Sequence, residues 1–144
     1  MNIPHKSQWT VTASSGDPQA AIDDSYSTQW NCDASPNPWF EIDLGQIATV
    51  AGLEVYWGRN FAEAYSFRSS LDGEAWTHLC ATRHGEGGQN VFAFPPTEAR
   101  FVRWTCANPE PERGQEIIEF NLYGPGEAAS VLEAGRVASL GHAP

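Results

Sequence analysis

The sequence predicts an all-β fold, an antiparallel sandwich or barrel of about eight strands. Short runs along the chain alternate apolar and polar residues, which is the period of a strand that buries one face. Clusters of Gly, Pro, Asn and Asp separate these runs at the spacing of turns. No stretch with helical periodicity interrupts them. Together these observations favour an all-β class over a mixed one.

The expected strands follow one another in chain order. They are WTVTAS (9–14), WFEIDLG (39–45), LEVYW (53–57), AYSFRSS (64–70), AWTHLCATR (75–83), NVFAF (90–94), ARFVRWT (99–105) and EIIEFNLYG (116–124). In the second run, Phe40, Ile42 and Leu44 fall on one face, while Glu41 and Asp43 fall on the other. The first face is therefore expected to meet the core.

The same alternation continues in later runs, and an Asp-Gly turn signal in SLDGEAW (70–76) separates two of them. The alternation directs a further set of side chains inward: Leu53, Val55, Trp57, Ile118, Phe120 and Leu122. These residues complete the expected core.

Composition and charge limit what the chain can bind. Its 144 residues, 41% of them hydrophobic, suit one domain with a single core. The 8 basic residues stand against 18 acidic ones, a formal net charge of −10. This balance disfavours nucleic acids and anionic membranes, because Lys/Arg surfaces bind both. The chain shows neither an apolar run of membrane-spanning length nor a signal-peptide pattern, so we expect no membrane insertion.

The composition of the sequence changes after the last expected strand. Residues 1–124 carry the strand pattern and are expected to form one domain. The following EAASVLEAGRVASLGHAP (127–144) is rich in Ala, Gly and Glu and shows little alternation. We therefore expect residues 125–144 to be a linker or the start of a following domain.

The three cysteines, Cys32, Cys80 and Cys106, have no CxxC spacing, which disfavours a zinc or thioredoxin-type site. One disulfide with a free thiol and three buried thiols are both compatible with the sequence. Cys32 and Cys106 flank loops and are the favoured pair, which leaves Cys80 as the expected buried thiol.

Sequence motifs for catalysis are missing. GxSxG, HExxH, Walker A and GxGxxG do not occur, and HGEGGQN (84–90) is glycine-rich but has the wrong spacing. The 4 histidines are scattered. Carboxylates that could serve glycoside hydrolysis are common, but nothing singles out a pair among Glu54, Glu63, Asp72, Glu86 and Glu116. We therefore expect no enzymatic activity.

Seven fragments carry a family resemblance by their order and spacing. They are WTVTASS (9–15), AIDDSYSTQW (21–30), PWFEIDLGQ (38–46), VAGLEVYW (50–57), SLDGEAWT (70–77), ARFVRWT (99–105) and IIEFNLYG (117–124). In this register the chain resembles the discoidin domain family, also called the coagulation factor 5/8 type C domain. The bacterial sugar-binding members of that family are grouped as carbohydrate-binding module family 32. The resemblance implies an eight-stranded antiparallel jelly-roll β-sandwich.

The resemblance also implies a structural calcium ion held by the loop that begins AIDDSYST (21–28). Ca²⁺ takes about six to eight oxygen ligands from carboxylates, carbonyls and hydroxyls, and this loop is rich in them. Carried over by position, the implied ligands are the carbonyls of Ala20 and Ile118 and the side chains of Asp23, Ser25, Thr28 and Glu119. Such a site would pin the start of the chain to its last strand.

Two residues of this loop depart from the family pattern. Asp24 stands where such domains usually have Gly, although Asp tolerates left-handed backbone better than most residues. Ser25 stands where they often have Asn or Asp, which removes an amide or carboxylate ligand. By themselves, the residues also fit a solvated acidic turn in which Thr28 bonds to the local backbone.

Loops at one end of such a sandwich carry the contacts that family members make with sugars, lipids or proteins. Sugar sites combine aromatic faces with planar polar groups. The loop WGRNFAEAY (57–65) offers both, and TRHGEGGQN (82–90) is a second, polar loop. The candidate ligand-binding residues are Trp57, Arg59, Asn60, Phe61, Arg83, His84 and Asn90, with Asn31, Trp39, Asn108 and Arg113 in neighbouring loops. Trp57 and Trp39 also fit the core, and the others also fit ordinary polar loops.

The loops and the resemblance together predict a non-catalytic carbohydrate-binding module. The expected partner is a neutral glycan with a galactose-type or N-acetylhexosamine end, because a surface at −10 repels uronate or sulfated chains. The module is expected to belong to a larger secreted or cell-surface protein. An adhesion or protein-recognition discoidin domain and a structural spacer are the alternatives.

Overall fold

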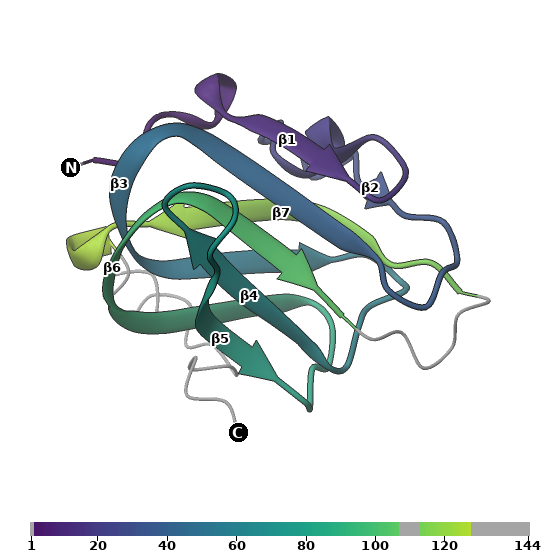
Figure 1. Ribbon diagram of the computed structural model, residues 1–144. Coiled ribbons are helices and arrows are strands. Elements are labelled where there is room, and N and C mark those ends of the chain that lie inside the picture. The colour runs from purple at the N-terminus through teal and green to yellow at the C-terminus, as the bar shows by residue number, and fades with distance from the viewer. Residues whose placement is uncertain (1, 107–112, 128–144) are drawn as a thin grey trace.

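Residues 2–106 and 113–127 are described by the computed structural model, in which strands predominate (Figure 1). Two 3-10 helices, η1 (Lys6–Gln8) and η2 (Pro18–Ala21), flank the first strand. The strands are β1 (Thr10–Ala13), β2 (Trp30–Asn31), β3 (Trp39–Trp57), β4 (Tyr65–Ser70), β5 (Thr77–Thr82), β6 (Gln89–Thr105) and β7 (Glu116–Tyr123). Residues 125–127 are helical. None of the helices in the described part of the chain is long and apolar enough to span a bilayer.

Strands β3 and β6 each run through both layers of the sandwich. The first half of β3 pairs with the second half of β6, and the second half of β3 pairs with the first half of β6. Register shifts between Asp43 and Ala48 and between Val50 and Gly52 bend the pair at its middle. In Figure 1 both strands curve at the left of the view, β3 in blue and β6 in teal and green.

The remaining strands extend these two arms into layers. One layer has the order β1-β3-β6-β4-β5 and the other has the order β2-β7-β3-β6, with antiparallel pairing throughout. The predicted antiparallel jelly-roll sandwich is therefore confirmed. The strand count differs from the prediction, because four predicted runs merge into the two bent strands and the short β2 was not predicted.

The core between the layers is aromatic. Trp30, Trp104 and Phe40 are fully buried, and the Trp30 ring lies 5.7 Å from the Trp104 ring and 5.4 Å from the Phe40 ring. Phe67 of β4 stacks on Phe120 of β7 at 5.5 Å, which joins the two layers. Every side chain predicted to face inward from β3 is buried, as the alternation requires.

One inward-facing prediction for the last strand is wrong. Ile118 is only partly buried, whereas its neighbour Ile117 is 1% exposed. The cause is a register shift, since Tyr56 pairs with Glu119 but the next residue, Trp57, pairs with Ile117. Ile118 is the extra residue of this irregularity, so alternation counted back from Phe120 fails there.

The three cysteines are free and buried, so the predicted Cys32–Cys106 disulfide is wrong and the predicted buried thiol at Cys80 is confirmed. The Cys32 sulfur accepts a hydrogen bond from the backbone N–H of Gln115 at 3.2 Å. Burial raises the pKa of Cys106 to about 12. All three thiols are therefore held in their protonated, unreactive form at neutral pH.

Gly16→Ala is expected to destabilise the fold strongly. Gly16 has φ of +76°, and a Cβ there would lie 2.1 Å from the carbonyl oxygen of Asn31 in β2. Gly45 has φ of +83° but open space around it, so Gly45→Ala measures backbone strain alone. We expect a loss of about 1–2 kcal/mol of unfolding free energy for Gly45→Ala and about 3 kcal/mol or more for Gly16→Ala in urea denaturation. Equal losses in the two variants would contradict the close approach of Gly16 to β2.

Candidate functional site

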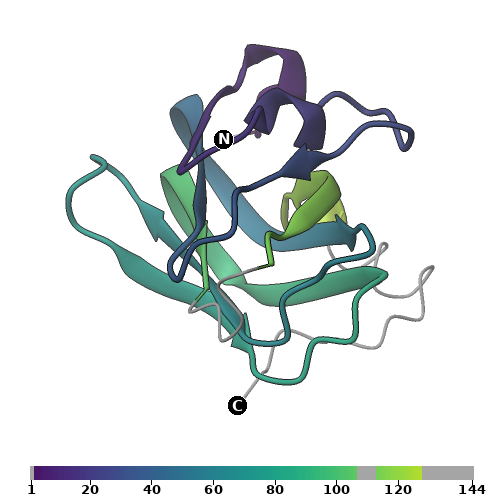
Figure 2. The same ribbon diagram turned by 90° about the vertical axis from the view of Figure 1, so that its right-hand side faces the viewer.

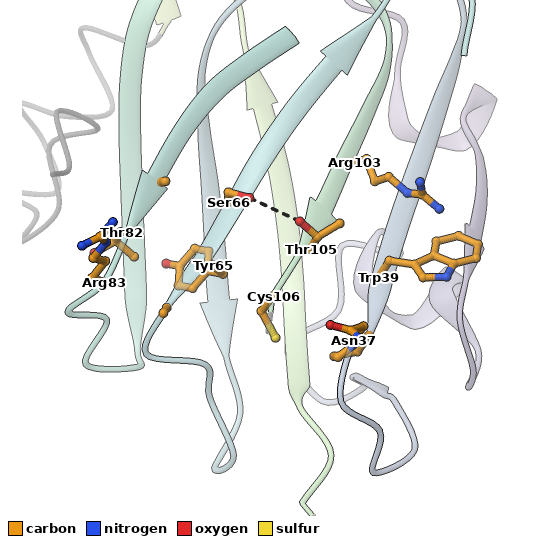
Figure 3. A pocket seen from close by; sticks show the side chains of 12 residues that line it. Asn37, Trp39, Tyr65, Ser66, Thr82, Arg83, Arg103, Thr105 and Cys106 are labelled. Carbon is orange, nitrogen blue, oxygen red and sulfur yellow. Dashed lines mark hydrogen bonds between the residues drawn. The ribbon is translucent and has the colours of Figure 1, made fainter. Parts of the chain in front are cut away.

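An open groove crosses the outer face of the layer β3-β6-β4-β5, near the loops at one end of the sandwich (Figure 3). Its volume is about 540 Å³. The start of β3, the start of β4, the end of β5 and the end of β6 supply its side chains. We call this feature the β4–β6 groove. Its lining includes Trp39, Ser66, Arg83, Arg103 and Thr105.

The alternation of β6 places polar side chains in the groove. Trp104 points into the core and is 1% exposed, so its neighbours Arg103 and Thr105 point to the opposite face. The Ser66 hydroxyl of β4 lies 3.3 Å from the Thr105 hydroxyl, directly across the strand pair (Figure 3). The floor of the groove therefore carries two hydroxyls that can both donate and accept hydrogen bonds.

One side of the groove is an aromatic and guanidinium pair. The Arg103 guanidinium lies 4.5 Å from the centre of the Trp39 ring, and its Nε lies 3.4 Å from a carboxylate oxygen of Glu41. A second tryptophan, Trp76, lies 5.8 Å from the same guanidinium. Stacking on flat rings orients the planar guanidinium, which suits it to directed hydrogen bonds.

The opposite side of the groove is formed by Thr82 and Arg83 (Figure 3). Arg83 is exposed and was predicted to contact ligand. Within the described part of the chain, its guanidinium makes no hydrogen bond or ion pair. Its donors are therefore available to a ligand in the groove.

The structure brings the two predicted ligand loops together beside the groove. The backbone N–H of Gly85 donates to the carbonyl of Glu63 at 2.8 Å, and Gly87 lies so close to the Phe61 ring that a Cβ would be 2.7 Å from it. Arg59 and His84 are exposed on these loops. Two of the loops that the sequence singled out thus form one surface, although they are separated along the chain.

Asn60 is tied into this surface by Glu116 at the start of β7. The Asn60 side-chain amide donates to one carboxylate oxygen at 3.0 Å, and its backbone N–H donates to the other at 3.2 Å. These bonds hold the β3–β4 loop against β7 and leave Asn60 one side-chain acceptor for a ligand.

Two predicted ligand residues, Trp57 and Asn90, lie in the core at 4% and 3% exposure. The Asn90 side-chain oxygen accepts hydrogen bonds from the Trp57 indole and the Tyr65 hydroxyl, each at 2.9 Å. The Asn90 amide donates to the carbonyls of Gly87 and Gln89. Burial raises the pKa of Tyr65 far above its usual range, which keeps its hydroxyl a donor. This cluster supports the base of the two predicted ligand loops from below.

Sequence reasoning missed Arg103, Thr105 and Ser66 as candidates. A signal for Arg103 was present, since the inward-facing Val102 and Trp104 imply that the side chain between them points outward. Among the neighbouring loop residues, Trp39 lies in the groove, while Asn108 lies outside the described residues.

The predicted calcium loop is held by its own hydrogen bonds. The Asp23 carboxylate accepts from the Thr28 hydroxyl at 2.6 Å and from the backbone N–H of Ser25 at 3.0 Å. Partial burial acts to raise the pKa of Asp23, but these bonds outweigh it and hold that pKa below its usual value. Asp24 has φ of +59°, the left-handed conformation expected at a position where the family usually has Gly. Ala20 lies in η2, and Ile118 lies at the irregularity of β7.

The last predicted calcium ligand, Glu119, is fully buried and meets a lysine. The Lys6 ammonium contacts one carboxylate oxygen of Glu119 and lies 3.0 Å from a carboxylate oxygen of Asp24. Burial raises the pKa of Glu119, an effect that Lys6 and the backbone N–H of Asp24 oppose. A cation therefore already contacts Glu119, and the residues do not fit Ca²⁺ in this arrangement. In the part of the chain that the structure describes, no group of three or more His, Cys, Asp or Glu side chains could hold a metal ion.

Comparison with known proteins matches this architecture. The family model of the F5/8 type C domain matches residues 4–120. Chitosan-binding module 1 from a chitosanase/glucanase of Paenibacillus sp. IK-5 is similar over 81% of this chain and 96% of its own, with 28% identity and a TM-score of 0.76. Module 2 of that enzyme, solved with chitotriose, has 28% identity, 81% and 97% coverage and a TM-score of 0.74.

A more distant structure has the same fold. The family 32 carbohydrate-binding module of Clostridium perfringens NanJ, solved with galactose, has 20% identity, 82% and 95% coverage and a TM-score of 0.71. No curated protein sequence matches the chain significantly.

Asn90→Ala is expected to lower the unfolding free energy, because it removes the acceptor of two buried donors, the Trp57 indole and the Tyr65 hydroxyl. The expected loss is about 1–3 kcal/mol for each donor left unpaired. Arg59→Ala, at an exposed loop position, is the control and should leave stability unchanged. Urea denaturation of the two variants checks this, and an unchanged midpoint for Asn90→Ala would show that the residue does not support the loops.

Proposed function

The chain belongs to the F5/8 type C domain family, and on that premise we propose that it is a non-catalytic carbohydrate-binding module. The observation that carries this proposal is the β4–β6 groove, which combines a tryptophan, two guanidinium groups and the floor hydroxyls of Ser66 and Thr105. Sugars present hydroxyls to planar donors and acceptors and C–H faces to aromatic rings, so this set of groups matches their chemistry.

The proposed binding surface is the groove together with the adjoining loops. Arg83 belongs to both, because it lines the groove and lies next to His84 in the β5–β6 loop. Arg59 and Phe61 extend the surface on the β3–β4 loop. For Trp57 and Asn90 we propose a supporting role, since both are buried. Affinity should lie between micromolar and millimolar, because each hydroxyl bond adds only about 0.5–1.5 kcal/mol net of water.

We propose a neutral glycan with a galactose-type or N-acetylhexosamine end as the ligand. We favour a neutral glycan because the chain has a formal net charge of −10, which opposes the binding of acidic polysaccharides. Glucosamine chains are a second candidate, favoured by two observations. Both Paenibacillus modules, which share 28% identity with this chain, are described as chitosan-binding, and a surface at −10 attracts protonated amino sugars.

We further propose that the domain targets a larger secreted protein to its polysaccharide. In support of this, the Paenibacillus modules derive from a larger protein, a chitosanase/glucanase. An adhesion or protein-recognition domain is the alternative. Binding to a purified protein partner with no binding to any glycan would favour it.

Arg83→Ala is expected to weaken glycan binding by about tenfold, because it removes charge-assisted donors from one side of the groove. Thr105→Val removes a floor hydroxyl at nearly constant volume and should weaken binding by a smaller factor. Arg68, an exposed arginine of β4 that does not line the groove, provides the matched control Arg68→Ala. Calorimetric titration with galactose, N-acetylhexosamine and glucosamine oligomers measures the change. Equal affinities in all three variants would place the site elsewhere.

The salt dependence of binding separates the two glycan classes. Attraction between a surface at −10 and protonated glucosamine chains is screened by salt, so that affinity should fall as ionic strength rises. Affinity for a neutral glycan should stay constant, since hydrogen bonds and stacking carry it. Titration at low and high sodium chloride gives the result.

A panel without any bound glycan would overturn the carbohydrate proposal.

A further inference from the structure

Lys6 is the only lysine of the chain, and it is 8% exposed. Lysine side chains are rarely buried to this extent unless they are paired. The Lys6 ammonium contacts Glu119 and lies 3.0 Å from Asp24, so it joins the N-terminal segment, the loop after η2 and strand β7. Lys6 and Glu119 are 113 residues apart in the sequence.

The Glu119 carboxylate depends on this partner. It is fully buried, and one of its oxygens receives both the Lys6 ammonium and the backbone N–H of Asp24, the latter at 3.0 Å. Its other oxygen has no hydrogen-bond partner in the described part of the chain. A buried carboxylate without a cation is strongly unfavourable. No other cationic side chain within the described residues forms an ion pair with it.

The ammonium and a calcium ion compete for the same place. Ca²⁺ requires its oxygen ligands at about 2.3–2.6 Å, and the Glu119 oxygen that faces the loop is in contact with the ammonium. Two cations at one carboxylate also repel each other, and Asp24 directs its own carboxylate to Lys6. Glu119, the buried carboxylate of the ligand set implied for calcium, is thus already paired with a cation from within the chain.

We propose that the Lys6 ammonium is the built-in counter-ion of Glu119, taking the place expected of Ca²⁺, so that the fold of this chain does not require calcium. The ammonium ties the N-terminal segment to β7, which is the link that the expected metal site would have made. In Figure 2 that segment, in purple, lies across the top of the view above β7, in yellow-green.

Further contacts hold Lys6 in position. The Trp9 indole, at the end of η1, donates to the carbonyl of Pro4 at 2.9 Å and is itself buried. His5 caps η1, its ring nitrogen accepting from the backbone N–H of Ser7 at 3.1 Å. Hydrogen bonds of the residues on both sides of Lys6 therefore fix the backbone of η1. From this fixed backbone the Lys6 side chain extends into the interior.

The first experiment is thermal unfolding of the unmodified protein in chelator and in millimolar Ca²⁺. The proposal predicts the same melting temperature in both, because the native state binds no calcium at Glu119 and gains no linked stability. A melting temperature that falls in chelator and recovers with Ca²⁺ overturns the proposal and returns Ca²⁺ to this carboxylate. The readout is stability alone, so it is independent of whether the groove binds glycans.

The second experiment is a double-mutant cycle with Lys6→Met and Glu119→Gln. Lys6→Met keeps the aliphatic stem but leaves the carboxylate buried without a cation, so Glu119→Gln should stabilise the Lys6→Met protein and destabilise the unmodified one. We expect a coupling of about tenfold or more in the unfolding equilibrium constant. The matched control is Asp43 and Arg100, an ion pair at 2.9 Å whose side chains are 26% and 42% exposed, which should couple more weakly. Coupling at Glu119 no larger than in this control would overturn the proposal.

Discussion

Strands β3 and β6 pair with each other in both layers of the sandwich, and every other strand takes its place from that pairing. β1 and β7 add to β3, β4 adds to β6, and β5 and β2 follow at the outside. The register shifts near Asp43 and Val50 make this possible, because they bend two long strands and interrupt their pairing only locally, so that the ladder resumes on the far side of each shift. A straight β3 would leave the aromatic side chains of the two layers facing water.

The same strands make the groove and the core at once. Along β6, Trp104 fills the interior while Arg103 and Thr105 face the groove, so the position of the candidate ligand surface follows from core packing. The loops at this end are fixed from below by Asn90, whose side-chain oxygen is shared by Trp57 and Tyr65. Such buried support positions a binding surface in advance, which reduces the entropy lost when a ligand binds.

Two buried carboxylates, Glu54 and Glu119, lie in the layer β2-β7-β3-β6, and each has a different kind of partner. Lys6 neutralises Glu119, whereas Glu54 is satisfied by neutral donors, with Asn121 and Tyr123 donating to one oxygen at 2.9 and 2.8 Å. The two arrangements differ in consequence. Neutral donors come from neighbouring strands and stabilise the sheet locally, while the lysine comes from the start of the chain and closes the fold over β7.

The sequence by itself determined which side chains face inward, because alternation is a local property of a strand and Phe40, Ile42 and Leu44 needed no further information. It also singled out two loops that the structure brings together, and the unusual Asp24. It did not reveal that β3 is continuous, that Ile118 falls at an irregularity, or that Asn90 is a buried support for Trp57 and Tyr65, since each depends on pairing with a distant strand. Only the tertiary structure decided which cation meets Glu119, because Lys6 lies 113 residues away and no local pattern joins them.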